Sequence, residues 1–270
     1  MRHRARRPGT GSSAALGGVR ILSPAVLLIV PALLLILPAV LLGAQADDSV
    51  KPGLTLARLK YGGGGDWYSN PTSLPNLARE LEKRTSIPIS QFQEAQVAPL
   101  DEELFFYPIV YMNGHGKVSL TENEIGRLRR YLIEGGFLWA DDNYGMDESF
   151  RALMRRVFPE RSLVEVPFEH PIYHAFYAFP KGPPKIHEHD AKPPRGYGIF
   201  DRGRLVVFYT YESDIGDGLE DEGIHDDPPE QREEAMRMAI NIVVHAVMGE
   251  ASPEPIGAVV RRAPYPPPAR

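Results

Sequence analysis

Glycine, asparagine, histidine and aspartate are concentrated in four short segments, each of which follows an apolar run. The segments are GGGGDWYSN (62–70), NGHG (113–116), DDNYG (141–145) and ESDIGDG (212–218). Their side chains accept or donate protons, bind hydroxyl groups and coordinate cations. In an open parallel sheet, the loops that follow the strands lie at the carboxyl edge, where ligands bind. We therefore expect the four segments to form one polar site.

His115 and Asp142 are the candidate catalytic residues. His115 lies between two glycines just after a predicted buried strand, so its imidazole is free to act as a base, a donor or a metal ligand. Asp141 and Asp142 are adjacent, and neighbours in an extended segment point to opposite sides. One is expected to face the site while the other braces or caps a helix. The alternative is a purely structural role, with a histidine bonded to backbone and aspartates that cap helices.

Acidic residues in these segments are candidate ligands for a metal ion. If two of the aspartates at 141, 142, 214 and 217 share the pocket, their repulsion raises one pKa or favours a hard cation such as Ca²⁺ or Mg²⁺. The metal ligands and the cofactor are otherwise unknown. His187-Glu188-His189-Asp190 lacks the spacing of a helical zinc-protease motif, and nearby prolines exclude a helix. A loop His-x-His site is the alternative that remains there.

The tetraglycine run lets the backbone approach a ligand or adopt positive φ. It matches neither the dinucleotide fingerprint nor the phosphate loop, and a pliable turn is the alternative. Trp67 and Tyr68 offer rings that can stack on a sugar or on a neighbouring loop. The residues expected to bind a ligand are Tyr61, Gly63, Gly64, Asp66, Trp67, Tyr68, Asn113, Gly116, Asp141, Asn143, Tyr144, Ser213 and Asp214.

Short apolar runs alternate with amphipathic stretches, which predicts an α/β domain with a mainly parallel sheet. Strands are expected at 54–61, 106–112, 137–140 and 163–166, and a hairpin at 196–213. Helices are expected at 74–85, from Thr121 with a Glu124 capping box, from Asp147 as cap, and after 227–230. Strands 106–112 and 137–140 should be parallel, because a helix joins them. Residues 168–195 are predicted to be a long ordered insertion.

The first 46 residues predict export. Five arginines precede an apolar run at 24–42, and Gly43-Ala44-Gln45-Ala46 suits signal peptidase. An uncleaved anchor is the alternative, because ~19 apolar residues nearly span a bilayer, and residues 20–42 would then be the only membrane contact. The expected order is a signal peptide or anchor at 1–46, a linker at 47–53, the α/β domain at 54–249 and a disordered proline-rich tail at 250–270. The expected location is the periplasm or cell envelope.

Charge and composition exclude several classes of function. All five of those arginines and none of the acids lie before residue 47, which leaves 25 Lys+Arg against 35 Asp+Glu in the remainder. This acidic balance argues against nucleic acid and anionic lipid as partners. The absence of cysteine excludes disulfides, thiolate metal sites and a cysteine nucleophile. No Gly-x-Ser-x-Gly elbow occurs either.

Four stretches of the chain resemble a bacterial family described only as domain of unknown function 4159. They are ARLKYGGGGDWYSNPTSLPNLARELEKRTSI, YPIVYMNGHGKVSLTENEIGRLRRYLIEGGFLWADDNYGMDESF, FEHPIYHAFYAFPKGPPKIHEHD and GRLVVFYTYESDIGDGLED, and the resemblance covers roughly residues 54–249. It implies a flavodoxin-like, class I glutamine amidotransferase-like three-layer sandwich. Such domains also occur attached to membrane-anchored regions in larger proteins.

The resemblance implies no established activity. Amidotransferase chemistry uses a cysteine at the strand-to-helix elbow, where this chain has Asp142-Asn143-Tyr144, so the likeness extends to architecture and site location only. Two functions remain. The first is an envelope binding module for a carbohydrate, a peptide or another envelope protein. The second is a hydrolase of an envelope substrate, in which His115 and one of Asp141, Asp142 or Asp214 act as base and orienting acid, with or without a divalent metal. The lack of an obvious nucleophile favours the first.

Overall fold

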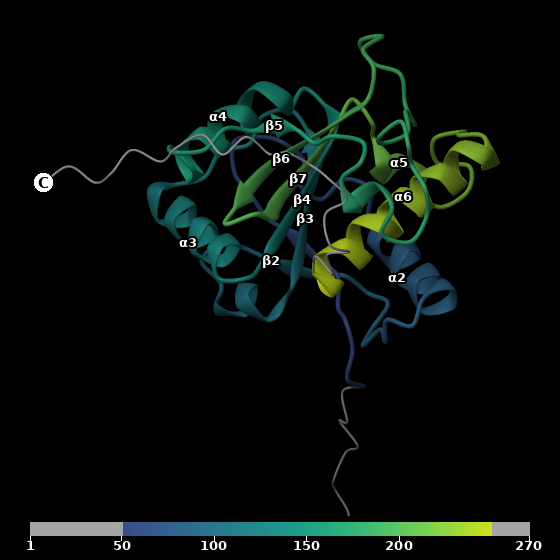
Figure 1. Ribbon diagram of the computed structural model, residues 1–270, viewed down its shortest axis with the longest axis horizontal. Helices are drawn as coiled ribbons and strands as arrows, with labels where there is room; N and C mark the ends of the chain where they lie inside the picture. The colour runs from purple at the N-terminus through teal and green to yellow at the C-terminus, as the bar shows by residue number, and fades with distance from the viewer. Residues whose placement is uncertain (1–50, 250–270) are drawn as a thin grey trace, which may run out of the picture. The chain divides into compact units, whose positions relative to one another are not determined.

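A seven-stranded sheet runs through residues 51–249, the part of the chain that the computed structural model describes (Figure 1). In spatial order the strands are β2 (Ala95–Val97), β1 (Ala57–Leu59), β3 (Ile109–His115), β4 (Phe137–Tyr144), β7 (Arg204–Tyr211), β6 (Arg195–Asp201) and β5 (Val164–Glu165). The first five are parallel to one another, whereas β6 is antiparallel to both β7 and β5. The mainly parallel sheet, the parallel β3–β4 pair and the β6–β7 hairpin confirm the predictions.

Helices cover both faces of this sheet (Figure 1). On one face, α2 (Ser73–Arg84) and α6 (Pro229–Met248) pack in a core with Tyr111, Trp139 and Phe208. On the other face, α3 (Glu122–Ile133) and α4 (Asp147–Val157) pack in a second core with the strand residues that alternate with those three. Alternation along the central strands thus supplies an apolar surface to both helix layers, because successive strand side chains point to opposite faces.

Local signals set the starts of the helices on the second face. Thr121 and Glu124 form the expected capping box, in which the Glu124 carboxylate accepts a 2.7 Å hydrogen bond from the Thr121 backbone N–H. In α4 the expected apolar face is buried, comprising Phe150, Leu153, Met154 and Val157. The prediction of Asp147 as its cap is wrong, because Met146 occupies the cap position and Asp147 is the first helical residue.

The structure differs from the other expected boundaries where elements are short or polar. The strand expected at 54–61 is regular only over β1, and β3 starts at Ile109 because Glu102–Phe106 form the short helix η1. Strand β4 continues past Ala140 to Tyr144, since its polar end is buried by tertiary partners. Strand β2 and the short helix α5 (Ile215–Gly218) were not expected.

The insertion between β5 and β6 contains one short helix, η2 (Pro171–Tyr173), and is otherwise irregular. No helix within residues 51–249 is long and apolar enough to cross a membrane. The signal or anchor expected at 1–46, the first part of the expected linker (47–50) and the tail expected at 250–270 lie outside the described residues.

Candidate functional site at the carboxyl edge of the sheet

The loops that follow β1, β3, β4 and β7 meet at the carboxyl edge of the sheet. The side chain of His115, the last residue of β3, lies 3.1 Å from the Asp66 carboxylate in the β1 loop. Asn143 of β4 accepts a 3.0 Å hydrogen bond from the Gly114 backbone. Asn70, also in the β1 loop, donates a 2.6 Å hydrogen bond to Asp217 in α5. The structure therefore brings the four polar segments together.

The tetraglycine segment packs against the protein's own backbone. A Cβ atom at Gly63 would lie 2.7 Å from the Ser119 nitrogen and 2.8 Å from the Lys117 oxygen, and φ at Gly63 is +105°. Gly62 and Gly65 bond to the same segment, through Ser119 and Lys117. Only glycine allows this approach at positive φ. The space beside Gly63 is thus filled by other parts of the protein, whereas a Cβ at Gly64 would meet nothing within 4 Å.

His115 pairs with Asp66 and not with the aspartates that the sequence suggested as its partners. Its backbone N–H also donates to the Asp66 carboxylate, so both Asp66 oxygens hold this residue. The His115 side chain is 50% exposed. No hydrogen bond joins His115 to Asp141, Asp142 or Asp214 among the described residues. The pair stands in the β1–β3 part of the edge, with the exposed ring of Tyr68 in the same loop.

Asp141 and Asp142 point to opposite faces of β4. The Asp141 carboxylate is fully buried and accepts hydrogen bonds from the Gly216 and Ile215 backbone, at 2.7 and 3.3 Å, at the start of α5. Asp142 accepts from the Met146 backbone at 3.3 Å and from the Tyr209 hydroxyl at 2.9 Å. Burial raises the pKa of Asp141 to about 7 and that of Asp142 to about 6, despite these donors.

Four other residues expected to bind ligand are buried and structural. The Tyr61 hydroxyl donates to the Asn113 carbonyl at 2.8 Å, and the Asn113 amide donates to Ser69 at 2.9 Å. Asn143 bonds to Asp217 at 3.1 Å, and Ser213 donates to the Pro184 carbonyl. All four are at most 6% exposed. Their amides and hydroxyls hold the loops in place and are not open to a ligand.

A buried arginine holds the loop that follows β1 through hydrogen bonds. Arg58 is fully buried in β1 and forms an ion pair with Glu94 at 2.8 Å. Its remaining N–H groups donate to the Ser69 and Asn70 carbonyls, at 2.7 and 2.9 Å, and to the Asn113 side chain. The planar guanidinium thus satisfies several loop oxygens at once, which a lysine cannot do. No local sequence signal indicated this role.

A cavity of about 300 Å³ opens between the ends of β4 and β7. Two expected residues, Asp142 and Tyr144, line it, and Tyr144 is 51% exposed. The other lining residues were not among the expected ligand-binding residues, and they include Asp147, Glu148, His189, Asp190, Tyr211 and Glu212. They come from α4, the insertion and the end of β7, which only the folded chain places together. Trp67, Tyr68 and Gly116 are not among its lining residues.

Three histidines and two aspartates form a cluster beside this cavity. His189 contacts the Tyr144 ring, with centroids 5.0 Å apart, and its Nε2 lies 2.9 Å from the Asp214 carboxylate. The His187 ring stacks on His189 with centroids 5.6 Å apart. His187 and His225 both approach Asp217, at 3.1 and 3.4 Å. Burial first, and then the negative charge of Asp217, raise the pKa of Asp214 well above its usual range.

The turn after β7 holds two residues in a strained conformation. Glu212 and Asp214 have φ of +54° and +57°, in the left-handed region that only glycine adopts without cost. Asp214 is the cap residue of α5, and Glu212 accepts a 2.9 Å hydrogen bond from Lys185. Strain of this kind is retained where surrounding contacts over-determine it, and it is found most often at functional sites.

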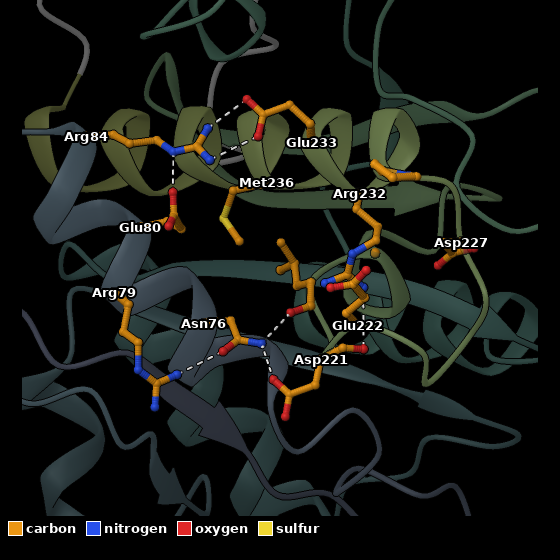
Figure 2. Close-up of a pocket in the computed structure, with 13 residues that line it drawn as sticks. Asn76, Arg79, Glu80, Arg84, Asp221, Glu222, Asp227, Arg232, Glu233 and Met236 are labelled. Atoms are coloured by element: carbon orange, nitrogen blue, oxygen red, sulfur yellow. Dashed lines mark hydrogen bonds and ion pairs between the residues drawn. The ribbon is translucent and has the colours of Figure 1, made fainter.

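A larger cavity, of about 490 Å³, lies between α2, α6 and the segment after α5 (Figure 2). One of its charged residues, Arg84, binds Glu233 at 2.8 and 3.0 Å and also binds Glu80. Asn76 bonds to Asp221 at 2.9 Å (Figure 2). Arg79 and Arg84 are thus bound to protein partners. No residue of β3 or β4 lines this cavity, which makes it a weaker candidate than the one at the carboxyl edge.

A mainly parallel sheet covered by helices on both faces, with polar loops at its carboxyl edge, defines the class of α/β domain. Within this class, residues 55–247 match the family described as Domain of unknown function (DUF4159). The chain belongs to this family, which confirms the resemblance seen in the sequence. No functionally curated protein matches the sequence.

Proposed function

We propose that the protein is a ligand-binding module of the bacterial cell envelope, and that its ligand, a carbohydrate or a peptide, occupies the cavity beside Tyr144. The observation that carries this proposal is the position of the cavity, at the carboxyl edge between β4 and β7. Ligands of parallel α/β sheets bind at this edge. Its volume, about 300 Å³, is at the lower end of the range for small-ligand pockets.

The chemistry of the lining favours a ligand that is rich in hydrogen-bond donors. Five carboxylates and one ammonium group line the cavity, namely those of Asp142, Asp147, Glu148, Asp190, Glu212 and Lys192. Three of the carboxylates also pair with cations of the protein, which are Arg151, Lys192 and Lys185. Ionised carboxylates only accept hydrogen bonds, so sugar hydroxyls or a peptide amino group suit them. The Tyr144 ring, half exposed at the rim, offers an apolar face on which a sugar ring can stack.

The placement in the envelope rests on the sequence of residues 1–46, where a basic start and an apolar run favour export or anchoring. Another envelope protein is therefore a further candidate partner. The strand order and the helices on both faces support the finer assignment to a flavodoxin-like, class I glutamine amidotransferase-like sandwich.

Calorimetric titration of the full-length protein with soluble cell-wall glycan fragments, with and without their peptides, tests the proposal. We expect Tyr144→Ala to weaken binding about tenfold, which corresponds to about 1.4 kcal/mol. Tyr68→Ala is the matched control, because Tyr68 is also exposed but lies outside the cavity. Binding that is weakened by Tyr68→Ala and unchanged by Tyr144→Ala would place the ligand elsewhere, and no binding of any fragment would reject this ligand class.

A hydrolase is the second candidate, and Asp142 is the residue that favours it. Asp142 lines the cavity, receives a 2.9 Å hydrogen bond from Tyr209, and has its pKa raised to about 6 by burial. A carboxyl group with this pKa can exchange a proton near neutral pH. Turnover of the same fragments that is lost in Asp142→Asn while binding persists would select the hydrolase. Binding without turnover by the unmodified protein would select the binding module.

A further inference from the structure

We propose that His187, Asp217 and His225 form a binding site for Zn²⁺. The three residues come from different parts of the chain: the insertion, helix α5 and the segment before α6. One possible ligand atom of each lies within 4.8 Å of those of the other two. This site goes beyond the proposed ligand cavity, because it stands whether or not that cavity binds a carbohydrate or peptide.

The spacing of the ligand atoms suits a zinc ion. Nδ1 of His187 lies 3.1 Å, and Nδ1 of His225 lies 3.4 Å, from the same Oδ2 atom of Asp217. Two ligands of a tetrahedral zinc site are about 3.3 Å apart, since each is about 2.0–2.1 Å from the metal. The His187 and His225 rings are perpendicular, with centroids 6.0 Å apart. Zinc can therefore be bound with small side-chain movements.

Hydrogen bonds orient the Asp217 carboxylate so that one oxygen can bind the metal ion. Its Oδ1 atom accepts hydrogen bonds from Asn70 at 2.6 Å and from Asn143 at 3.1 Å, which leaves Oδ2 directed at the two histidines. Hydrogen bonds of this kind to a ligating carboxylate fix its orientation in metal sites. Asp217 is buried, while the His187 and His225 side chains are 38% and 25% exposed, so solvent reaches the site from the histidine side.

Buried polar atoms around the three residues lack hydrogen-bond partners among the described residues. Asp214 is fully buried beside Asp217, and its Oδ1 atom has no hydrogen-bond donor among the described residues. Buried atoms of His225 (Nε2) and Asp227 (Oδ2) likewise have no partner there. The other oxygen of Asp214 lies 2.9 Å from Nε2 of His189, so one oxygen of this acid is left without a partner, which is costly in a buried position. Adjacent buried carboxylates also repel each other. A divalent cation at the three proposed ligands reduces the repulsion between Asp217 and Asp214.

The donor set selects the type of metal. Ca²⁺ and Mg²⁺ prefer oxygen ligands, whereas two imidazoles and one carboxylate suit Zn²⁺, Co²⁺ or Fe²⁺. This set differs from the all-oxygen site that the aspartates alone suggested. Three protein ligands leave a fourth position for water or a ligand, which is the arrangement of catalytic zinc sites.

Metal titration of the chelator-treated, full-length protein tests the site. We expect one equivalent of Zn²⁺ or Co²⁺ to bind and to raise the melting temperature, with Co²⁺ giving the visible absorption of a four-coordinate site, and Mg²⁺ to change neither. His225→Ala and Asp217→Asn should each weaken Zn²⁺ binding by at least about 100-fold. Asp217→Asn keeps an oxygen for Asn70 and Asn143, which limits the damage to the fold.

His174→Ala is the matched control. His174 is an exposed histidine of the same insertion whose Nε2 lies 2.9 Å from the Phe168 carbonyl, outside the proposed site. The His174→Ala variant should bind Zn²⁺ with the same affinity as the unmodified protein. The proposal is overturned if the folded, unmodified protein binds no Zn²⁺. It is also overturned if binding survives both His225→Ala and Asp217→Asn in folded variants, or is lost equally in His174→Ala.

Discussion

At the scale of single residues, burial shifts the proton affinities of acids and histidines in opposite directions. Burial raises the pKa of Asp141 to about 7 and that of Asp142 to about 6. His170 and His245 pack together with ring centroids 5.3 Å apart, and burial lowers the pKa of each to about 4. In each case the charged form is disfavoured because it leaves water.

These shifts predict how the free energy of unfolding depends on pH. For the two aspartates, the folded state binds more protons than the unfolded state between about pH 4 and 7, so their contribution to stability increases as pH falls through that window. For the two histidines, the unfolded state binds more protons between about pH 6.5 and 4, so their contribution decreases as pH falls. The two effects oppose each other over nearly the same range.

Removing one histidine should therefore expose the contribution of the aspartates. We expect His245→Phe to gain stability relative to the unmodified protein as pH falls from about 6.5 to 4, by up to about 1.4 kcal/mol per pH unit. Asp141→Asn should lose stability relative to the unmodified protein as pH falls from about 7 to 4. Urea unfolding at a series of pH values measures both. Parallel pH profiles for all three proteins would show that these groups titrate normally in the folded state.

The sequence predicted which residue types gather at the site but not which of them are exposed. Gly, His and Asp marked the four loops correctly because their conformational freedom and polarity are local properties. Asn113 and Asn143 were expected to contact a ligand, yet both are fully buried. The burial of an amide depends on its partners, such as Arg58 and Asp217, which are distant in sequence. His225 carried no local signal at all.

At the scale of elements, long periodic segments were predictable and short ones were not. Helix α3 with its capping box and the β6–β7 hairpin follow from spacing within one segment. Strand β2 has three residues and α5 has four, too few for a period to show. The polar end of β4 was missed for another reason. Its Asp141, Asp142 and Asn143 side chains are accommodated by partners on other elements.

The tetraglycine loop gives a prediction at this scale. Gly63→Ala should lower the free energy of unfolding by about 1–3 kcal/mol, because the new Cβ meets the 117–119 backbone at positive φ. Gly62→Ala is the matched control. The nearest atom to its new Cβ is 3.4 Å away, and the φ of Gly62 lies outside the left-handed region. Chemical denaturation of both variants measures the difference. Equal stability of the two would mean that the loop does not pack as described.

At the scale of the whole molecule, topology gathers the site. The parallel order β1-β3-β4-β7 places the ends of four strands side by side, and the insertion before β6 returns to this edge so that His187 and His189 reach Asp217 and Asp214. The edge then presents the His115–Asp66 pair, the cavity beside Tyr144 and the three proposed zinc ligands. The proposals about ligand and metal both depend on this convergence.

A double-mutant cycle between Asn70 and Asp217 tests the convergence most directly. These residues lie 147 positions apart, and their side chains share a buried 2.6 Å hydrogen bond. Urea unfolding of Asn70→Ala, Asp217→Ala and the double variant, in chelator, should give a coupling energy of about 1 kcal/mol or more. In the control cycle, Asn70→Ala is combined with Thr121→Ala, which removes the cap of α3. The effects of these two substitutions on the free energy of unfolding should be additive. A coupling within about 0.3 kcal/mol of zero for Asn70 and Asp217 would contradict the shared site.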